Sequence, residues 1–187
     1  EPPRPLPPGK SEHANDRGTR IHTAAEAFVK SDPKVELVDE LKAFEPELLQ
    51  LQSLHEAGQV SLEGDWAYNK KWEPVAWMSH NVRMRIKCDV VAFMSLQHAV
   101  VIDYKSGKRW GNEIKHAEQM QIYQLGAFLR YPKLTKVTVE LWYTDQDELH
   151  SLEYRRDQGL RFVVGIDKRL DAMLAEEEFK PNPNAYS

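Results

Sequence analysis

Cysteine, long apolar stretches and net positive charge are all scarce in this sequence of 187 residues. A single cysteine, Cys88, excludes an internal disulfide framework and a metal cluster held by several thiolates, and it is typical of a reducing compartment such as the cytoplasm. No apolar run approaches the roughly 20 residues that a membrane span needs, so we expect no membrane partner.

The net charge of −4 argues against a protein that coats nucleic acid without regard to sequence, because such proteins are usually basic. It leaves open an enzyme that holds divalent cations, since the carboxylates of such a site lower the formal charge when the metal is not counted. With 41% hydrophobic and 29% charged residues, the composition is that of a globular domain.

The chain is predicted to consist of an extended N-terminal arm and one domain. Five of the first eight residues are proline, which favours an extended arm over residues 1–16. Residues 17–187 have a length and composition that suit a single domain with its own core.

Hydrophobic periodicity divides the domain into helices and strands. The predicted helices are 19–30, 37–54 with a break at Pro46, 114–129 and a last one within 158–179, and the predicted strands are 60–68, 82–93, 99–104 and 136–143. This order favours an α/β or α+β layer fold with a mixed central β-sheet flanked by helices.

An acidic residue two positions before a lysine occurs five times, so this pattern alone carries no information. Only Asp103 and Lys105 stand at the end of a strand that looks buried, where they point to the same side because side chains alternate along a strand. A surface ion pair would explain them equally well if nothing else lay nearby.

Asp89 changes that balance because it lies on the preceding strand. A hairpin between the two strands would bring Asp89 beside Asp103, and two close carboxylates repel each other unless one is protonated or a cation lies between them. A divalent cation with oxygen ligands is the natural occupant. The neighbouring Cys88 is expected to be a small buried residue and not a ligand.

The first and the third predicted helices add further polar residues. His22 and Glu26 are four residues apart and share one face of their helix, and an imidazole among oxygen ligands suits manganese. In the helix 114–129, Gln119 and Tyr123 are predicted to share the face opposite Ile114 and Phe128. A solvated helix face is the alternative for this second pair.

In this order, Gly18-x-x-x-His22-x-x-x-Glu26, Asp89, Asp103-Tyr-Lys105 and Gln119-x-x-x-Tyr123 resemble the RecB-type branch of the PD-(D/E)xK nuclease superfamily. That branch includes the RecB and AddB nuclease domains, the CRISPR-adaptation nucleases and many phage exonucleases. The resemblance implies a restriction-endonuclease-like α/β core and hydrolysis of DNA phosphodiesters with Mg²⁺ or Mn²⁺, as an exonuclease in recombination, repair or phage DNA processing.

The resemblance also implies roles for individual residues. His22, Asp89, Asp103 and the backbone carbonyl of Tyr104 would be metal ligands, and Lys105 would be the catalytic lysine. Glu26 would support the catalytic site, and Gln119 and Tyr123 would line the DNA path and the edge of the active site. Iron–sulfur members carry additional cysteines, which this chain lacks, so no iron–sulfur cluster is expected.

Local positive charge is expected to contact DNA despite the acidic total. Arg85, Lys108 and Arg109 lie near the site in sequence, and Trp110 and Tyr123 are able to stack on bases. Besides DNA, a homo-oligomer or a recombination protein is a candidate partner. The alternatives to the enzyme are a catalytically inactive DNA-binding or scaffolding module and an unrelated interaction domain.

Overall fold

The computed structural model describes residues 13–107 and 109–179. The helical elements are α1 (Ala14–Val29), the 3₁₀ helix η1 (Asp39–Phe44), α2 (Glu45–Glu56), α3 (Glu113–Arg130), α4 (Arg156–Leu160) and α5 (Phe162–Phe179). The strands are β1 (Val60–Tyr68), β2 (Pro74–Val75), β3 (Met84–Phe93), β4 (His98–Lys105), β5 (Lys136–Tyr143) and β6 (Glu148–Arg155).

The six strands form one mixed sheet in the order β2-β1-β3-β4-β5-β6. Neighbouring strands are antiparallel except for β4 and β5, which run parallel because α3 connects them. The predicted hairpin between the strands of Asp89 and Asp103 is confirmed by the antiparallel pairing of β3 with β4. The predicted α/β fold with a mixed central sheet is therefore confirmed.

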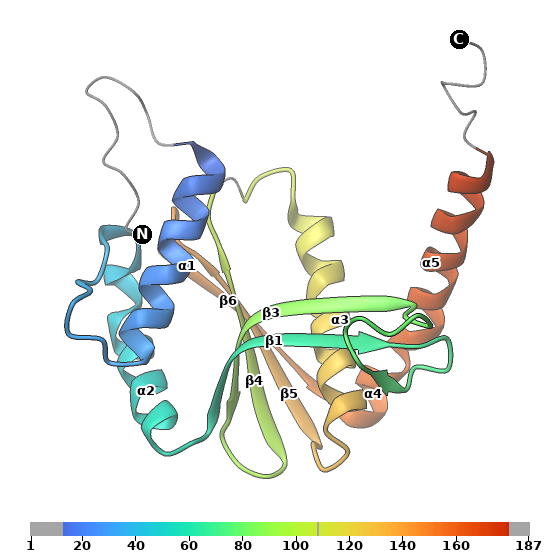
Figure 1. The fold of residues 1–187 in the computed structure, drawn as a ribbon, viewed down its shortest axis with the longest axis horizontal. Coiled ribbons are helices and arrows are strands. Elements are labelled where there is room, and N and C mark those ends of the chain that lie inside the picture. Colours follow the sequence, from blue (N-terminus) through green and yellow to red (C-terminus); the bar gives the residue numbers. More distant parts are fainter. Residues whose placement is uncertain (1–12, 108, 180–187) are drawn as a thin grey trace.

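Helices cover both faces of the sheet, and Figure 1 shows α1 and α2 on one side of β4 and β5 and α3, α4 and α5 on the other. One apolar cluster lies between α1, η1, α2 and the sheet, with Ile21, Leu41 and Leu48 fully buried. A second cluster lies between the sheet and α3 and α5, with Phe128 and Ile166 at its centre. Each face of the sheet thus has its own core.

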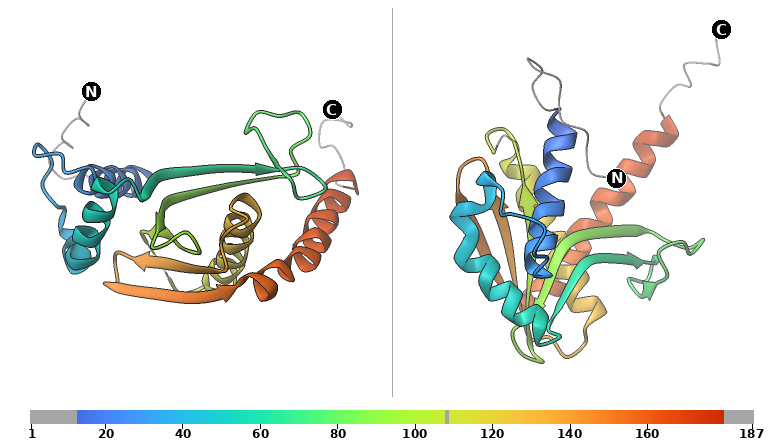
Figure 2. Two further views of the ribbon diagram at one scale, coloured as in Figure 1. Left: turned by 90° about the horizontal axis from the view of Figure 1, so that it is seen from below. Right: turned by 60° about the vertical axis from the view of Figure 1, so that its left-hand side comes forward.

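The strand β3 leaves β4 part-way along its length. Its pairing with β4 runs from Phe93 to Val90, whereas its pairing with β1 continues to Met84. From this fork, β1 and β3 extend together as a two-stranded ribbon toward α5, which the left view of Figure 2 shows. The N–H and C=O groups on that edge of β4 beyond Ile102 are therefore open to side chains.

The ribbon also twists at the fork. Val90 and Ala92 pack in the cluster under α1 and α2, but Ile86 and Cys88, which have the same strand parity, pack in the cluster under α3. Gly64 of β1 lies opposite Cys88, and a Cβ at this glycine would stand 2.5 Å from the Cys88 sulfur. The glycine therefore permits the close approach that the twist requires, and Cys88 is a buried residue as predicted.

Three local predictions were wrong. The helix α1 begins at Ala14, so the last three residues of the expected arm 1–16 are helical, while residues 1–12 lie outside the described part. The strand β6 was missed because it is an edge strand in which nearly every residue is exposed, so its sequence does not alternate. Ile114 and Phe128 were expected on one face of α3 opposite Tyr123, but Ile114 is 80% exposed, whereas Phe128 and Tyr123 are both buried. Within the described residues, no helix is long and apolar enough to span a membrane.

Candidate active site

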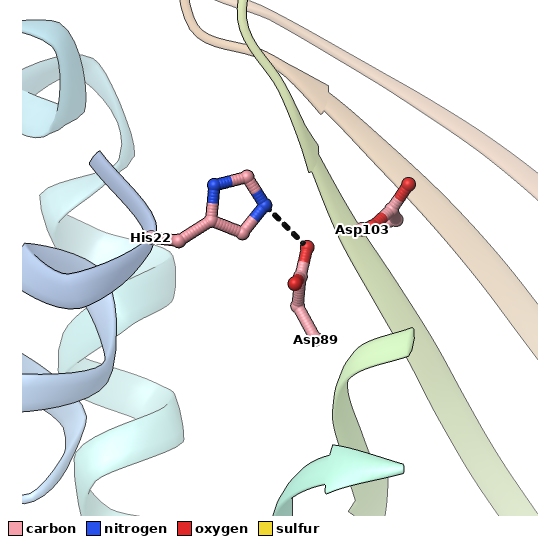
Figure 3. A group of neighbouring side chains, drawn as sticks. All are labelled: His22, Asp89 and Asp103. Atoms are coloured by element: carbon pink, nitrogen blue, oxygen red, sulfur yellow. Dashed lines mark ion pairs between the residues drawn. The ribbon is translucent and has the colours of Figure 1, made fainter. Parts of the chain in front are cut away.

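The predicted site residues come from three elements that meet at the fork between β3 and β4. The helix α1 supplies His22 from one side of the sheet, β3 supplies Asp89 at the fork, and β4 supplies Asp103. One potential ligand atom from each of the three side chains lies within 4.8 Å of the other two. Figure 3 shows Asp89 between the other two side chains. The fork thus lets a helix on one face reach a strand residue that points to the opposite face.

His22 is held by a hydrogen bond on each ring nitrogen. Its Nδ1 lies 2.7 Å from the carbonyl oxygen of Gly18 and its Nε2 lies 3.1 Å from Oδ2 of Asp89. Because a carbonyl only accepts, Nδ1 carries a proton, so Nε2 is the atom with a lone pair available to a metal. Without a cation, Nε2 must be protonated to bond the carboxylate, and this bond raises the pKa of His22 to about 9.

The carboxylate of Asp89 accepts a backbone hydrogen bond that a neighbouring strand would otherwise accept. Its Oδ2 accepts the backbone N–H of Tyr104 at 2.8 Å, a group on the edge of β4 from which β3 has departed. Burial by itself would raise the pKa of Asp89, but the hydrogen bonds with His22 and Asp103 and the charge of His22 hold it below its usual value. Asp89 is therefore an ionised carboxylate in a fixed position.

Asp103 is the more deeply buried carboxylate, with 7% of its surface exposed. Its Oδ2 accepts hydrogen bonds from Lys105 Nζ at 2.7 Å and from the Tyr123 hydroxyl at 3.2 Å. Burial, followed by the hydrogen bond and charge repulsion of Asp89, raises the pKa of Asp103 to about 7, although Lys105 opposes the shift. The prediction that Asp103 and Lys105 point to the same side is confirmed.

This donor set fits a divalent cation. It offers one imidazole nitrogen and two carboxylates, a combination that binds Mg²⁺ and, through the nitrogen, Mn²⁺. A cation among them would offset the burial and the repulsion from Asp89 that raise the pKa of Asp103 to about 7. The fit therefore rests on the donor chemistry and on the shifted pKa of the buried carboxylate.

A pocket of about 450 Å³ opens beside these ligands. It lies between α1 and the fork, and its lining includes His22, Glu26, Asp89 and Tyr104. Glu26 is thus on the pocket wall one helical turn beyond His22, where its carboxylate forms an ion pair with Lys30 at 2.6 Å. The structure brings Glu26 to the site but leaves its catalytic role a prediction.

Among the remaining predicted contact residues, Arg85 and Arg109 make their contacts with residues other than the three central side chains. Arg85, on the ribbon, donates from Nε to the carbonyl of Trp77 at 2.9 Å and lies over that ring. Arg109 forms an ion pair with Glu148, and Lys108 lies outside the described residues. Gln119 is half-buried, and its Oε1 has no hydrogen-bond partner among the described residues. Their contacts with DNA remain predictions.

Tyr123 lies at the edge of the candidate site, but its ring is buried, so the expected stacking of this ring on a base was wrong, while its place beside the DNA path stays a prediction. It is 6% exposed, belongs to the core cluster under α3 and donates its hydroxyl to Asp103. A ring packed in a core cannot stack on a base. Tyr123 instead fixes the position of the Asp103 carboxylate.

Two groups of residues beside the site were missed by the sequence interpretation. Arg17 forms an ion pair with Asp145, whose carboxylate also accepts the N–H of Gly107 at 2.9 Å. His116 bonds the hydroxyl of Tyr143 at 2.9 Å, and Tyr143 is paired in register with Lys105. These contacts join residues from 27 to 128 positions apart, so no local pattern could have revealed them.

Comparison with known families decides which kind of site this is. The model of the PD-(D/E)XK nuclease superfamily matches residues 3–186. The chain belongs to the PD-(D/E)XK nuclease superfamily. The mixed sheet with helices on both faces is consistent with the restriction-endonuclease-like fold of this superfamily.

Individual proteins are much more distant than the family model. No curated protein matches the chain. Two solved structures are similar at 16% identity: the crystal structure of SSO0001, with a TM-score of 0.32 over 78% of this chain and 66% of that one, and an alkaline exonuclease of Laribacter hongkongensis, with a TM-score of 0.35 over 90% and 82%. The chain thus spans slightly less than two thirds of the first structure. At these TM-scores, neither similarity supports a conclusion about the function of this chain.

Proposed function

We propose that this chain is a Mg²⁺- or Mn²⁺-dependent deoxyribonuclease of the RecB-type branch that degrades DNA from its ends, in recombination, repair or phage DNA processing inside the cell. The observation that carries the proposal is the meeting of His22, Asp89 and Asp103 within 4.8 Å, with Lys105 bonded to Asp103, in a chain of a nuclease superfamily.

The proposed ligands are the side chains of His22, Asp89 and Asp103, joined by the backbone carbonyl of Tyr104. When bound there, a divalent cation polarises the scissile phosphate and lowers the pKa of a water molecule. His22 contributes Nε2 because Gly18 holds the proton of Nδ1. Asp89 is kept in place by the Tyr104 N–H, so its position does not depend on the cation.

Lys105 is the proposed catalytic residue that does not bind the cation. Its ammonium lies 2.7 Å from Asp103, so it is held within reach of a phosphate bound at the same centre. There it orients the attacking water or neutralises the charge that develops on the phosphate oxygens. Tyr123, which bonds the same carboxylate oxygen, limits the directions in which Asp103 can turn.

The proposal is tested by incubating the purified chain with linear and with covalently closed circular DNA in the presence of Mn²⁺, with and without a chelator. Loss of linear DNA only, prevented by the chelator, is the expected result, and loss of both forms would show an endonuclease. DNA that is retarded in a gel but stays intact would support the alternative, a catalytically inactive DNA-binding module.

The mechanism is tested with Lys105→Ala. We expect this variant to bind DNA nearly as well as the unaltered chain while its cleavage is abolished, because the metal ligands remain. Lys136→Ala is the matched control, since Lys136 lies at the opposite end of the β4–β5 pair, opposite His98. Unchanged cleavage by Lys105→Ala would remove this lysine from the mechanism.

A further inference from the structure

Trp110 is the most exposed of the five tryptophans. Three of the others, Trp66, Trp72 and Trp142, are at most 9% exposed, and Trp77 is half-buried under the guanidinium of Arg85. Trp110 is 83% exposed. Nearby in sequence, Ile114 in the first turn of α3 is 80% exposed, so two large apolar side chains face solvent on one short segment.

The loop that leads to Trp110 begins after Lys105, the proposed catalytic lysine, and its first residue lies close to α1, the helix of His22. Ser106 follows Lys105 directly, and its hydroxyl lies 3.3 Å from the point where Gly18 would carry a Cβ. Gly18 is the residue whose carbonyl holds His22. The next residue, Gly107, donates its N–H to Asp145, which in turn pairs with Arg17 of α1. The loop after β4 therefore runs along the edge of the candidate active site.

The far half of the loop is fixed as well. Arg109 forms an ion pair with Glu148, and its guanidinium lies 4.8 Å from the centre of the Tyr143 ring. Tyr143 is paired in register with Lys105 and bonds His116 of α3. The N–H of Asn112 closes a turn on the carbonyl of Arg109 at 3.1 Å. Trp110 thus stands on a turn whose neighbours are anchored beside Lys105.

A second protein would be a poor occupant for such a surface. Stable protein interfaces bury roughly 1,200–2,000 Å² around an apolar centre, whereas here two large apolar side chains are exposed on a short segment. The charges near them are mixed, since Arg109 is paired with Glu148, Glu113 precedes Ile114 and the exposed Lys115 follows it. An exposed aromatic ring beside the candidate site is instead an arrangement that binds single-stranded nucleic acid, whose bases stack on such a ring.

We propose that Trp110, flanked by Ile114, is a stacking platform for an unpaired base of the DNA strand that enters the active site, so that the preferred substrate is DNA with a single-stranded end. This inference rests on the proposed function, because it takes DNA as the substrate. It narrows the substrate class, since a base in an intact duplex keeps its faces covered by its neighbours.

The test compares a blunt duplex with the same duplex carrying a single-stranded extension. It uses Lys105→Ala in Mn²⁺, so that DNA binds at the ligated site without being cut. We expect the extended DNA to quench tryptophan fluorescence and to bind about tenfold more tightly than the blunt DNA. Trp110→Ala in the same background should abolish this preference, and Trp110→Phe should keep most of it because the ring remains.

Leu96→Ala is the matched control. Leu96 is 79% exposed and precedes β4, whereas Trp110 follows it, so the two residues are separated by a strand roughly 26 Å long. This variant should retain the full preference for extended DNA. If Leu96→Ala weakens the preference as much as Trp110→Ala does, exposed apolar residues act non-specifically and the proposal is overturned.

The two proposals fail in different ways. If the unaltered chain cuts DNA but Trp110→Ala keeps its preference for extended DNA, only the stacking platform is wrong. If the unaltered chain binds extended DNA through Trp110 but cuts no DNA, the proposed nuclease activity is wrong and the platform stands. A change in oligomeric mass on Trp110→Ala with unaltered DNA binding would show a protein contact and would also overturn the platform.

Discussion

Two clusters of charged residues lie at opposite ends of the β1–β3 ribbon, and their carboxylates differ in how far they are exposed to solvent. At the far end, Arg83 pairs with Asp167 at 3.2 Å and with Asp171 at 2.9 Å, while Trp72 donates to Asp167 at 3.0 Å. We call these four residues the clasp, because they attach the ribbon to α5. Its two carboxylates remain 40% and 70% exposed, so water shares the cost of their charge.

At the fork, in contrast, the carboxylates of Asp89 and Asp103 are withdrawn from water and face each other. Their balance depends on a protonated His22, on Lys105 and on a partly protonated Asp103. The carboxylates of the clasp are both paired with Arg83. At the fork, a divalent cation would replace the protons of His22 and Asp103 as the positive charge that balances the carboxylates. The solvent-exposed ion pairs of the clasp attach the ribbon to α5. Buried carboxylates that lie close together and have a shifted pKa are, in contrast, typical of a functional site.

The largest effect that separates the two clusters is expected from Asp103→Asn. Because this change removes a metal ligand and the partner of Lys105, cleavage in saturating Mn²⁺ should fall by at least about a thousandfold. The melting temperature should stay the same or rise, since the repulsion between Asp103 and Asp89 is lost. Cleavage rates and thermal unfolding measured on one preparation check this. A cleavage rate within tenfold of the unaltered chain would show that Asp103 is not a ligand.

A smaller effect is expected from pH. The cation needs a neutral His22 and an ionised Asp103, whose pKa values are raised to about 9 and about 7. Metal affinity should therefore increase as pH rises from 6 to 8.5, by up to about tenfold per pH unit for each proton that is released. Calorimetric titration with Mn²⁺ in buffers of different ionisation enthalpy counts these protons.

Two histidine variants provide the control for this pH dependence. His22→Asn should bind Mn²⁺ more weakly and with a shallower slope against pH. His98→Asn should behave as the unaltered chain does, because His98 bonds Thr138 at the opposite end of β4. An affinity that is flat between pH 6 and 8.5 would mean that the cation does not displace the proton of His22.

The smallest effect is expected at the clasp. Arg83→Ala should lower the melting temperature by roughly 2–4 °C, the equivalent of about 1 kcal/mol, because its ion-pair partners are largely solvated. Cleavage and Mn²⁺ affinity should stay unchanged, since α5 does not contribute to the fork. Loss of metal affinity in this variant would show that the ribbon, held by the clasp, determines the position of Asp89.

Much of this architecture was predictable because it depends on local patterns. The strand from Lys136 to Tyr143 alternates in sequence and was predicted with the observed bounds. The bounds Val60–Tyr68 were likewise correct. The break at Pro46 corresponds to the start of α2, where proline occupies the first turn. These elements follow from side-chain periodicity and from proline, which act over a few residues.

The order of the polar motifs was likewise sufficient to identify the family and the three side chains that meet at the candidate site. His22, Asp89 and Asp103 each occupy the place in the series that the family pattern predicts. Tyr123 does so too and lies beside the site, yet its ring is buried, so the expected stacking on a base was wrong. A sequence motif specifies which residue stands at a position, but not whether its side chain is buried. The ring of Tyr123 is buried in the core cluster that also contains Phe128.

The sequence by itself determined four of the six strands, the central helices, the polar residues of the candidate site and their order along the chain. Only the tertiary structure decided that β3 leaves β4 at Asp89, that the freed N–H of Tyr104 holds this carboxylate, and that His22 reaches it from the other layer. It also decided that Tyr123 is buried and Trp110 exposed. The physical reason is that burial and pairing depend on which elements pack together, and those contacts join residues far apart in the chain.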